Sequence, residues 1–350
     1  MRITPFIIFN QLTRGLSRAL NLYNTQNDRL NSGKKINAPS DNPTGLMRTM
    51  DYRVSVNAGE QYKRNIDSAM DNVNFTSTVM TSVYNTVIEL QKLVAKGKST
   101  QEPQELANSA DEAEAYRDML QDLANTKIMN QYLFSGFKSE TPPYDDAYVY
   151  QGDDGEVNVP VSAAGAQIPI NISGNSAFSF TGALPANKQI GANQWAHYSQ
   201  NGTEVTVVIN DNSNEPPDPL DPSQTDSFVF SNVIQMAEHL RDAISNIGDA
   251  DPVVSGNATA RISALEDPFT EMQEQLMSVQ TDLGGRVSSL NAHSKVIEQN
   301  TNTLHKAITS IEEADPVEIL AQLRQTEVTL QALRESAARV LSQSLFDFLR

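Results

Sequence analysis

The histidines are the residues of this sequence best able to bind a metal or to transfer a proton, since the chain contains no cysteine. They are His197, His239, His293 and His305. Metal-binding helices often place two histidines four residues apart, as in H-E-x-x-H, and none of these histidines has such a neighbour. The spacing therefore favours packed or solvated histidines over a metal site or a catalytic residue.

Two glycine-containing segments could also suggest a binding site. Asp153-Asp154-Gly155 has residue types found in calcium loops, but it lacks the EF-hand spacing, and Asp-Gly is typical of a hairpin turn. Gly284-Gly285 lacks the residues of a phosphate loop and lies inside a helical pattern, which favours a close helix contact or local flexibility. We therefore expect no cofactor, and a protein that is not an enzyme.

The composition argues against several kinds of partner. The 26 Lys and Arg are outnumbered by 43 Asp and Glu, which gives a net charge of −17 at pH 7. This charge disfavours binding to nucleic acid and to anionic lipid, because both carry negative phosphates. No apolar run approaches the ~18 residues of a membrane span, and the short N-terminal apolar stretch is not followed by a signal-cleavage site. We expect no membrane insertion and no cleaved signal.

Most of the chain shows the heptad spacing of coiled coils. The predicted helices cover residues 5–32, 43–98, 103–134, 232–247, 268–313 and 316–350. The longest pattern places apolar residues at eight consecutive heptad positions, from Ile262 to Ile311. With 39% hydrophobic residues, such a run is roughly a 1 in 2,000 event per register. Pro268 is expected to start or kink this helix, and Gly59 to mark a break in the helix over 43–98.

Residues 137–226 differ from the rest of the chain. They are rich in glycine and contain nine of the 16 prolines, and they show apolar residues at alternate positions, as in Val157, Val159 and Val161. Alternation with a period of two is typical of half-buried strands. The sequence thus predicts a β-rich domain inserted between helices.

An elbow separates the first two helices, over Leu30 to Gly45. A glycine suits the end of a helix, and an Asn-Pro pair suits the start of the next one. Asp315-Pro316 is the expected counterpart of this elbow on the returning part of the chain. The elbow residues that we single out are Gly33, Ile36, Asn37, Pro39, Asp41 and Pro43.

Short heptad seams lie at both ends of the chain. A seam of about 30 residues with polar members makes a marginal coiled coil alone, and an apolar tail is unusual on a monomer. We therefore expect the terminal seams to contact neighbouring subunits, and the long helices to form an intramolecular core. The predicted subunit contacts are Phe9, Leu12, Leu16, Tyr23, Leu30, Leu323, Leu330, Leu333, Val340, Leu341, Leu345, Phe346, Phe348 and Leu349.

The predicted fold is mainly α, an elongated coiled-coil bundle of N- and C-terminal segments with an inserted β-domain. Residues 1–42 and 315–350 are expected to form an inner coiled coil. Residues 43–136 and 231–314 are expected to form a bundle of long helices, with the β-rich domain over 137–230 between them.

Three segments resemble the flagellin family. They are the elbow LNSGKKINAPSDNPTG, the stretch NQYLFSGFKSETPPYD from Asn130 to Asp145, and the C-terminal LRQTEVTLQALRESAARVLSQSLFDFL. The start MRIT and the second stretch are similar to the branch of the family that joins the flagellar hook to the filament. The resemblance covers about residues 1–150 and 255–350.

This resemblance implies an extracellular structural protein at the hook–filament junction of a bacterial flagellum. It would be exported without a cleaved signal by the flagellar type III apparatus, with the help of an export chaperone. Its partners would be copies of itself, hook-associated protein 1 and flagellin. The alternatives are the flagellin filament subunit itself, or a coiled-coil protein secreted by a type III system.

Overall fold

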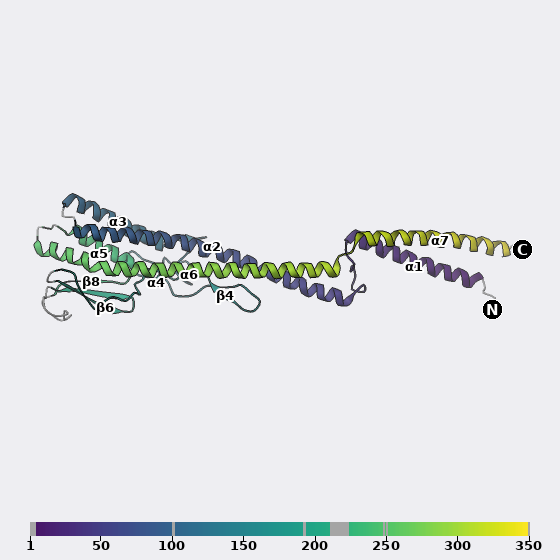
Figure 1. Ribbon diagram of the computed structural model, residues 1–350, viewed down its shortest axis with the longest axis horizontal. Helices are drawn as coiled ribbons and strands as arrows, with labels where there is room; N and C mark the ends of the chain where they lie inside the picture. Colours follow the sequence, from purple (N-terminus) through teal and green to yellow (C-terminus); the bar gives the residue numbers. More distant parts are fainter. Residues whose placement is uncertain are drawn as a thin grey trace. The chain divides into compact units, whose positions relative to one another are not determined.

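The computed structural model describes residues 5–99, 102–191, 194–210, 224–247, 249 and 251–348. The helices are α1 (Pro5–Ser32), α2 (Pro43–Ser99), α3 (Pro103–Ala124), α4 (Gly174–Phe178), α5 (Val233–Ser245), α6 (Pro252–Glu312) and α7 (Pro316–Phe348). The strands are β1 (Lys127–Ile128), β2 (Gln131–Tyr132), β3 (Asn158–Pro160), β4 (Gln167–Pro169), β5 (Asn187–Gln189), β6 (Trp195–Asn201), β7 (Glu204–Asn210) and β8 (Gln224–Phe230). The prediction of a mainly α fold with an inserted β-rich part is confirmed (Figure 1).

The chain divides into two compact units. The first, which we call the terminal unit, contains Met1–Gln61 and Val296–Arg350. The second, the central unit, contains Tyr62–Lys295. Because α2 and α6 each contribute residues to both units, the chain enters and leaves the central unit through helices.

The central unit has a helical core built from the long heptad patterns. Side chains at these positions of α2 and α6 are removed from solvent, as the periodicity predicts. Fully burying one Leu or Ile side chain stabilises the fold by about 1.5–3 kcal/mol. The buried heptad residues include Ile66, Val73, Met80, Val87, Leu90, Leu276, Leu283 and Leu290.

A four-stranded antiparallel sheet, in the order β5-β6-β7-β8, packs within the central unit. Phe228 and Phe230 of β8 are buried, and the ring of Phe230 meets that of Phe180 edge-on at 5.7 Å. Two-stranded antiparallel pairs are formed by β1 with β2 and by β3 with β4. The apolar alternation from Val157 to Val161 corresponds to a strand of only three residues, β3.

Three expectations about helix ends and breaks are wrong. The helix α3 stops at Ala124 instead of 134, because the Asn125 side chain bonds the backbone N–H and C=O of Tyr144 and begins the β1–β2 region. The helix α6 begins at Pro252, where the Asp251 carboxylate accepts from the N–H of Val253, so Pro268 lies inside this helix and does not start it. The alternative, a kink at Pro268, stays a prediction.

The helix α2 also continues without a break through Gly59. A Cβ at Gly59 would lie 2.9 Å from Oγ1 of Thr301, so the glycine allows α2 and α6 to approach closely. Gly284 and Gly285 show the opposite, since a Cβ at either position would meet nothing within 4 Å. Of the two alternatives expected at these glycines, the close helix contact is therefore wrong, and local flexibility stays a prediction.

None of the helices that the structure describes has an apolar stretch long enough to cross a membrane.

Candidate assembly surface

The helices α1 and α7 run side by side in the terminal unit (Figure 1). Gly15 lies against Leu333, with 3.7 Å between a Cβ built on the glycine and the leucine Cδ2, and the Tyr23 hydroxyl donates to Glu327 at 3.4 Å. Residues that rise along α1 thus meet residues that fall along α7, so the two helices are antiparallel. The two chain ends therefore form one two-helix pair.

The predicted seam residues that can be described fall within this pair. Leu330 is buried, and the others are half-buried: Leu12, Leu16, Tyr23, Leu30, Leu323 and Leu333. Leu349 and the side chains of the remaining predicted contacts lie outside the described residues: Phe9, Val340, Leu341, Leu345, Phe346 and Phe348. The structure thus gives the described seam residues an intramolecular partner, and their contact with other subunits stays a prediction.

Apolar side chains off the seam were missed by the sequence analysis. They are exposed on the outer faces of the pair: Ile7, Leu22, Val317, Leu320 and Val328. Their signal in the sequence is a second set of apolar residues spaced by three or four positions beside the a/d seam, as in Val317 and Leu320. A two-helix pair can bury only one stripe of each helix, so this second set stays exposed in the pair.

The first turns of α2 carry a further exposed apolar stripe. Met47, Met50 and Val54 are 68%, 54% and 68% exposed, and their spacing of three and four residues places them on one face of the helix. The inner face of the same segment is formed by Thr49, which is fully buried, and by Val56. Methionine is common on surfaces that accept a partner, because its side chain adapts its shape.

The elbow begins at Gly33, whose φ of 68° lies in the left-handed region. Its N–H donates to the carbonyl oxygen of Arg29 at 2.9 Å, which closes the last turn of α1. The Asp41 carboxylate then accepts from the N–H groups of Asn37 and Ala38, both at 3.0 Å. These two hydrogen bonds stabilise the ionised form and lower the pKa of Asp41.

The rest of the elbow positions the start of α2. Ile36 is buried, whereas Asn37 and Pro39 are exposed. Asn42 accepts from the N–H of Gly45 at 2.9 Å, so it is the N-cap that the Asn-Pro pair predicts, and Pro43 is the first helical residue.

The returning chain pairs with the elbow through its backbone. Lys35 donates to the carbonyl oxygen of Glu312 at 2.6 Å, and Ala314 donates to that of Gly33 at 3.0 Å. The Glu312 carboxylate, only 8% exposed, receives Arg53 at 2.6 Å and Lys34 at 3.8 Å. These contacts tie the two chain reversals of the terminal unit together.

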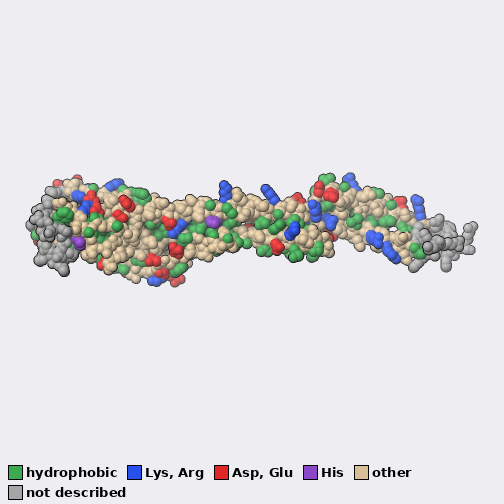
Figure 2. All heavy atoms as spheres, turned by 60° about the horizontal axis from the view of Figure 1, so that its bottom comes forward, with side chains coloured by type: hydrophobic (Ala, Val, Ile, Leu, Met, Phe, Trp, Pro, Cys, Tyr) green, Lys and Arg blue, Asp and Glu red, His purple; other side chains and the backbone are tan. Residues whose placement is uncertain are grey.

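Charge differs sharply between the two units. The terminal unit carries 13 Lys and Arg against 12 Asp and Glu, whereas the central unit carries 13 against 31. The negative charge of the chain thus belongs to the central unit. Hydrophobic side chains lie along the helices of the terminal unit among Lys and Arg side chains (Figure 2). A surface with little net charge and exposed apolar groups favours close packing of copies.

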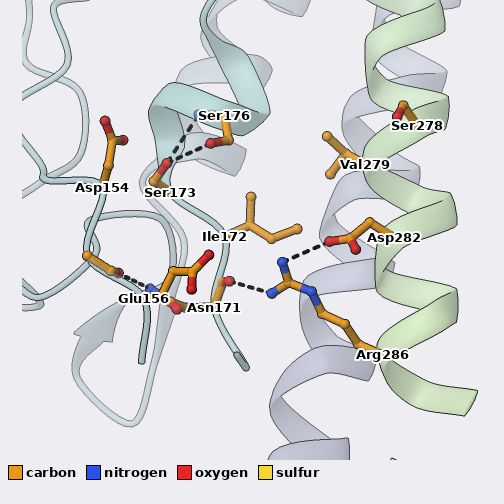
Figure 3. Close-up of a pocket in the computed structure, with 11 residues that line it drawn as sticks. Asp154, Glu156, Asn171, Ile172, Ser173, Ser176, Ser278, Val279, Asp282 and Arg286 are labelled. Carbon is orange, nitrogen blue, oxygen red and sulfur yellow. Dashed lines mark hydrogen bonds and ion pairs between the residues drawn. The ribbon is translucent and has the colours of Figure 1, made fainter. Parts of the chain in front are cut away.

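The central unit contains a pocket of about 250 Å³ beside α6. Arg286 donates to the carbonyl oxygens of Pro169 and Asn171 at 3.1 and 2.8 Å and pairs with Asp282 at 2.8 Å (Figure 3). The guanidinium group of Arg286 therefore binds groups of this chain, two carbonyl oxygens and one carboxylate. We interpret this cluster as the attachment of the β3–β4 region to α6.

The residues that the sequence analysis considered for metal binding or catalysis form hydrogen bonds within the chain. His197 lies 2.6 Å from Asn187, and His239 lies 2.8 Å from the carbonyl oxygen of Val229. The Asp153 carboxylate accepts from the N–H groups of Phe137 and Gly155, both at 2.8 Å, and so closes a turn. Within the described residues, no group of three His, Asp or Glu side chains is arranged to hold a metal ion.

Comparison with known proteins shows which proteins this chain is similar to. A family model described as the bacterial flagellin N-terminal helical region matches residues 5–139. Flagellar hook-associated protein 3 of Salmonella typhimurium is 27% identical over 187 residues, which cover 50% of this chain and 59% of that protein. Flagellar hook-associated protein 3 of Escherichia coli is 26% identical over 148 residues, which cover 42% of this chain and 47% of that protein.

The chain is similar to hook-associated protein 3 over about half of its length and to the flagellin N-terminal helical region over residues 5–139. It spans between about half and three fifths of the length of these two relatives.

Solved structures have the same fold. A putative flagellar hook-associated protein from Vibrio parahaemolyticus has a TM-score of 0.58 at 17% identity, covering 78% of this chain and all of that one. The flagellar junction protein FlgL from Legionella pneumophila has a TM-score of 0.55 at 15% identity, covering 76% and 100%. At these identities the match concerns the fold alone.

Proposed function

We propose that the chain is a structural subunit of the bacterial flagellum that joins hook-associated protein 1, at the end of the hook, to the flagellin filament. The observation that carries the proposal is the similarity to hook-associated protein 3, combined with a terminal unit that leaves apolar side chains uncovered. The relatives are structural proteins of the flagellum, which supports a role without catalysis. The chain would then act by contact alone.

The terminal unit is the part proposed to contact other subunits. Its near balance of positive and negative charge removes the repulsion that the central unit would impose on neighbouring copies. The outer residues of α1 and α7 and the stripe Met47, Met50 and Val54 provide the apolar area. The predicted contact residues at the ends of α1 and α7 would extend this surface, with neighbouring copies, hook-associated protein 1 and flagellin as partners.

We also propose how the segments of the chain divide into domains. The segments 1–42 and 315–350 would form the inner coiled coil of the junction. The helices over 43–136 and 231–314 would form the bundle of long helices, and the β-rich part over 137–230 would be an insertion in that bundle.

The location is proposed to be extracellular, at the hook–filament junction. The chain would reach it through the flagellar type III export apparatus after binding an export chaperone, without a cleaved signal. A narrow export channel requires an unfolded or readily unfolded chain. The absence of cysteine fits this route, because no disulfide has to be broken.

The proposal is tested in a strain that lacks this chain. We expect hooks without filaments and flagellin released into the medium, both restored by the full chain. The variant Met50→Lys should restore filaments poorly, because it puts a charge into the apolar stripe, whereas Asn57→Lys, at an exposed position of the same helix, should restore them fully. Normal filaments in the absence of the chain would contradict the proposal.

A second candidate function is that of flagellin, the filament subunit itself. The matching family model favours it, because that model describes the N-terminal region of flagellin. The two functions differ in amount, because a filament subunit is the bulk secreted product and a junction subunit is scarce. Quantifying the chain in purified flagella therefore separates them. An amount equal to that of the filament protein would assign the chain to the filament.

A further inference from the structure

One face of α6 contacts the four-stranded sheet of the central unit (Figure 1). Three positions of this helix, spaced by three residues and therefore on one face, each make a polar contact with a different strand. The pairs are Arg261 with Asp226 of β8 at 2.6 Å, the carbonyl oxygen of Ala264 with Tyr198 of β6 at 2.7 Å, and Asp267 with Lys188 of β5 at 2.5 Å. Since β5 and β8 are the two edge strands, the helix reaches from one edge of the sheet to the other.

The middle contact differs from the other two, because the sheet binds a backbone group of the helix. In an uninterrupted helix the carbonyl oxygen of Ala264 would accept from the N–H group four residues ahead. That residue is Pro268, which has no N–H group, so the oxygen lacks its usual donor within α6. Ala264 is fully buried, so water cannot replace the missing donor.

The hydroxyl group of Tyr198 supplies this donor. The tyrosine is only 6% exposed, and its hydroxyl donates to the carbonyl oxygen of Ala264. Burial raises the pKa of Tyr198, and the nearby Asp267 and Glu266 raise it further, so the hydroxyl stays protonated and remains a donor. The sheet thus satisfies a helix carbonyl that the helix cannot satisfy itself.

The outer contacts define the position of the sheet along α6 less closely. Lys188 pairs with Glu266 at 3.5 Å as well as with Asp267, and Glu266 also binds Lys98 of α2 at 3.0 Å. An ammonium group on a flexible stem can change its acceptor by one residue at little cost. Pro268, in contrast, frees one carbonyl oxygen at one defined place in the helix.

We propose that Pro268 determines where the sheet docks on α6, by leaving the carbonyl oxygen of Ala264 as a buried acceptor for the Tyr198 hydroxyl. Pro268 is therefore a positioning residue that acts through Tyr198 on the inserted β-rich part. The inference does not depend on the proposed function of the chain, because all of these residues lie in the central unit.

The test is a double-mutant cycle measured by hydrogen–deuterium exchange on the full chain. Tyr198→Phe keeps the ring but leaves the carbonyl oxygen of Ala264 unpaired, so we expect exchange of the β5, β6 and β7 amides to quicken by about tenfold. When Pro268→Ala is also present, the restored N–H group of the helix occupies this oxygen. Tyr198→Phe should then change exchange by less than about threefold.

Pro268→Ser restores the same N–H group and should give the same result as Pro268→Ala. An equal effect of Tyr198→Phe with and without the proline would overturn the proposal. So would the absence of any effect of Tyr198→Phe in the chain that keeps Pro268.

The matched control is Tyr144→Phe. Tyr144 is also buried, and its hydroxyl donates to the carbonyl oxygen of Gly174 at 3.0 Å, an acceptor that Pro268 does not provide. Exchange of the amides around Tyr144 should therefore quicken by the same factor with and without Pro268→Ala. If the effect of Tyr144→Phe depended on Pro268 as strongly as that of Tyr198→Phe, the cycle would report a general loosening of the unit and would contradict the proposal.

Discussion

At the scale of single residues, polar side chains of the central unit form hydrogen bonds with backbone groups and so fix helix ends and loops. Asn232 is the clearest case, since it is buried and its Oδ1 accepts from the N–H groups of Ile234 and Gln235 at the start of α5. Its Nδ2 donates to the carbonyl oxygen of Tyr148 at 2.7 Å. One side chain thus caps a helix and fastens the loop around Tyr148, whose φ of 59° is left-handed.

We predict that Asn232→Ala lowers the free energy of unfolding by about 1–3 kcal/mol, from the lost cap and the unpaired carbonyl oxygen. Asn232→Asp should lose less, because its carboxylate retains the cap. Chemical denaturation followed by circular dichroism measures both. An equal loss in the two variants would show that the cap contributes little.

His239 predicts a dependence of stability on pH. Its ring packs on Phe228 with 5.0 Å between centroids, and Nδ1 is buried without a partner. Burial lowers the pKa of His239 below its ordinary value of 6.5, the nearby Arg261 lowers it further, and the Val229 carbonyl, Asp242 and Glu238 act in the opposite sense.

Since the pKa is lower in the folded chain, the unfolded chain binds more protons between the two pKa values. The stability supplied by neutral His239 is therefore fully present above about pH 6.5 and is lost as the pH falls below that value. We predict that His239→Gln reduces this slope, whereas His305→Gln, at an exposed position, does not. Unfolding curves between pH 5 and 8 test this; identical slopes for the two variants would contradict it.

At the scale of elements, replacing either of two glycines by alanine should change stability in opposite directions, although both glycines have free space around them. A Cβ at Gly33 or at Gly284 would meet nothing within 4 Å, but Gly33 has a φ of 68° and Gly284 lies inside α6. Alanine at Gly33 would adopt a strained left-handed backbone, whereas alanine at Gly284 would reduce the entropy of the unfolded chain.

We predict that Gly33→Ala destabilises the terminal unit by about 1 kcal/mol and that Gly284→Ala stabilises the central unit by up to about 1 kcal/mol. Exchange rates of amides in each unit report these changes separately. A stabilising Gly33→Ala would mean that the elbow does not need the left-handed turn.

The helices were predicted well because their heptad spacing is carried by local sequence. The start of α2 at Pro43 and the end of α1 at Ser32 follow from the Asn-Pro pair and from Gly33. The early end of α3 could not be predicted, because it depends on Asn125 binding Tyr144, which is remote in sequence. The stripe of Met47, Met50 and Val54 could have been found from spacing, but only the structure shows which face the chain covers.

At the scale of the whole molecule, the contrast in charge suggests a division of tasks. The central unit carries 31 acidic against 13 basic residues, a net charge that would repel copies of itself. The terminal unit also exposes apolar side chains, and its charges are nearly balanced.

Removing the end of the chain tests this division. We predict that deleting residues 341–350 blocks incorporation into flagella and leaves the helical content almost intact, because the deletion removes only the last turns of α7. Circular dichroism and complementation of the deletion strain measure the two effects. A large loss of helix would instead make this tail part of the folded chain.

The central claim is that the terminal unit joins copies of this chain to the hook. The most direct measurement is electron cryomicroscopy of hooks from a strain that lacks the chain, after adding the purified protein. We predict a closed layer of copies at the hook tip, with α1, α7 and the first turns of α2 packed against neighbouring subunits. A layer held together through the central unit, or no binding to the tip, would contradict the claim.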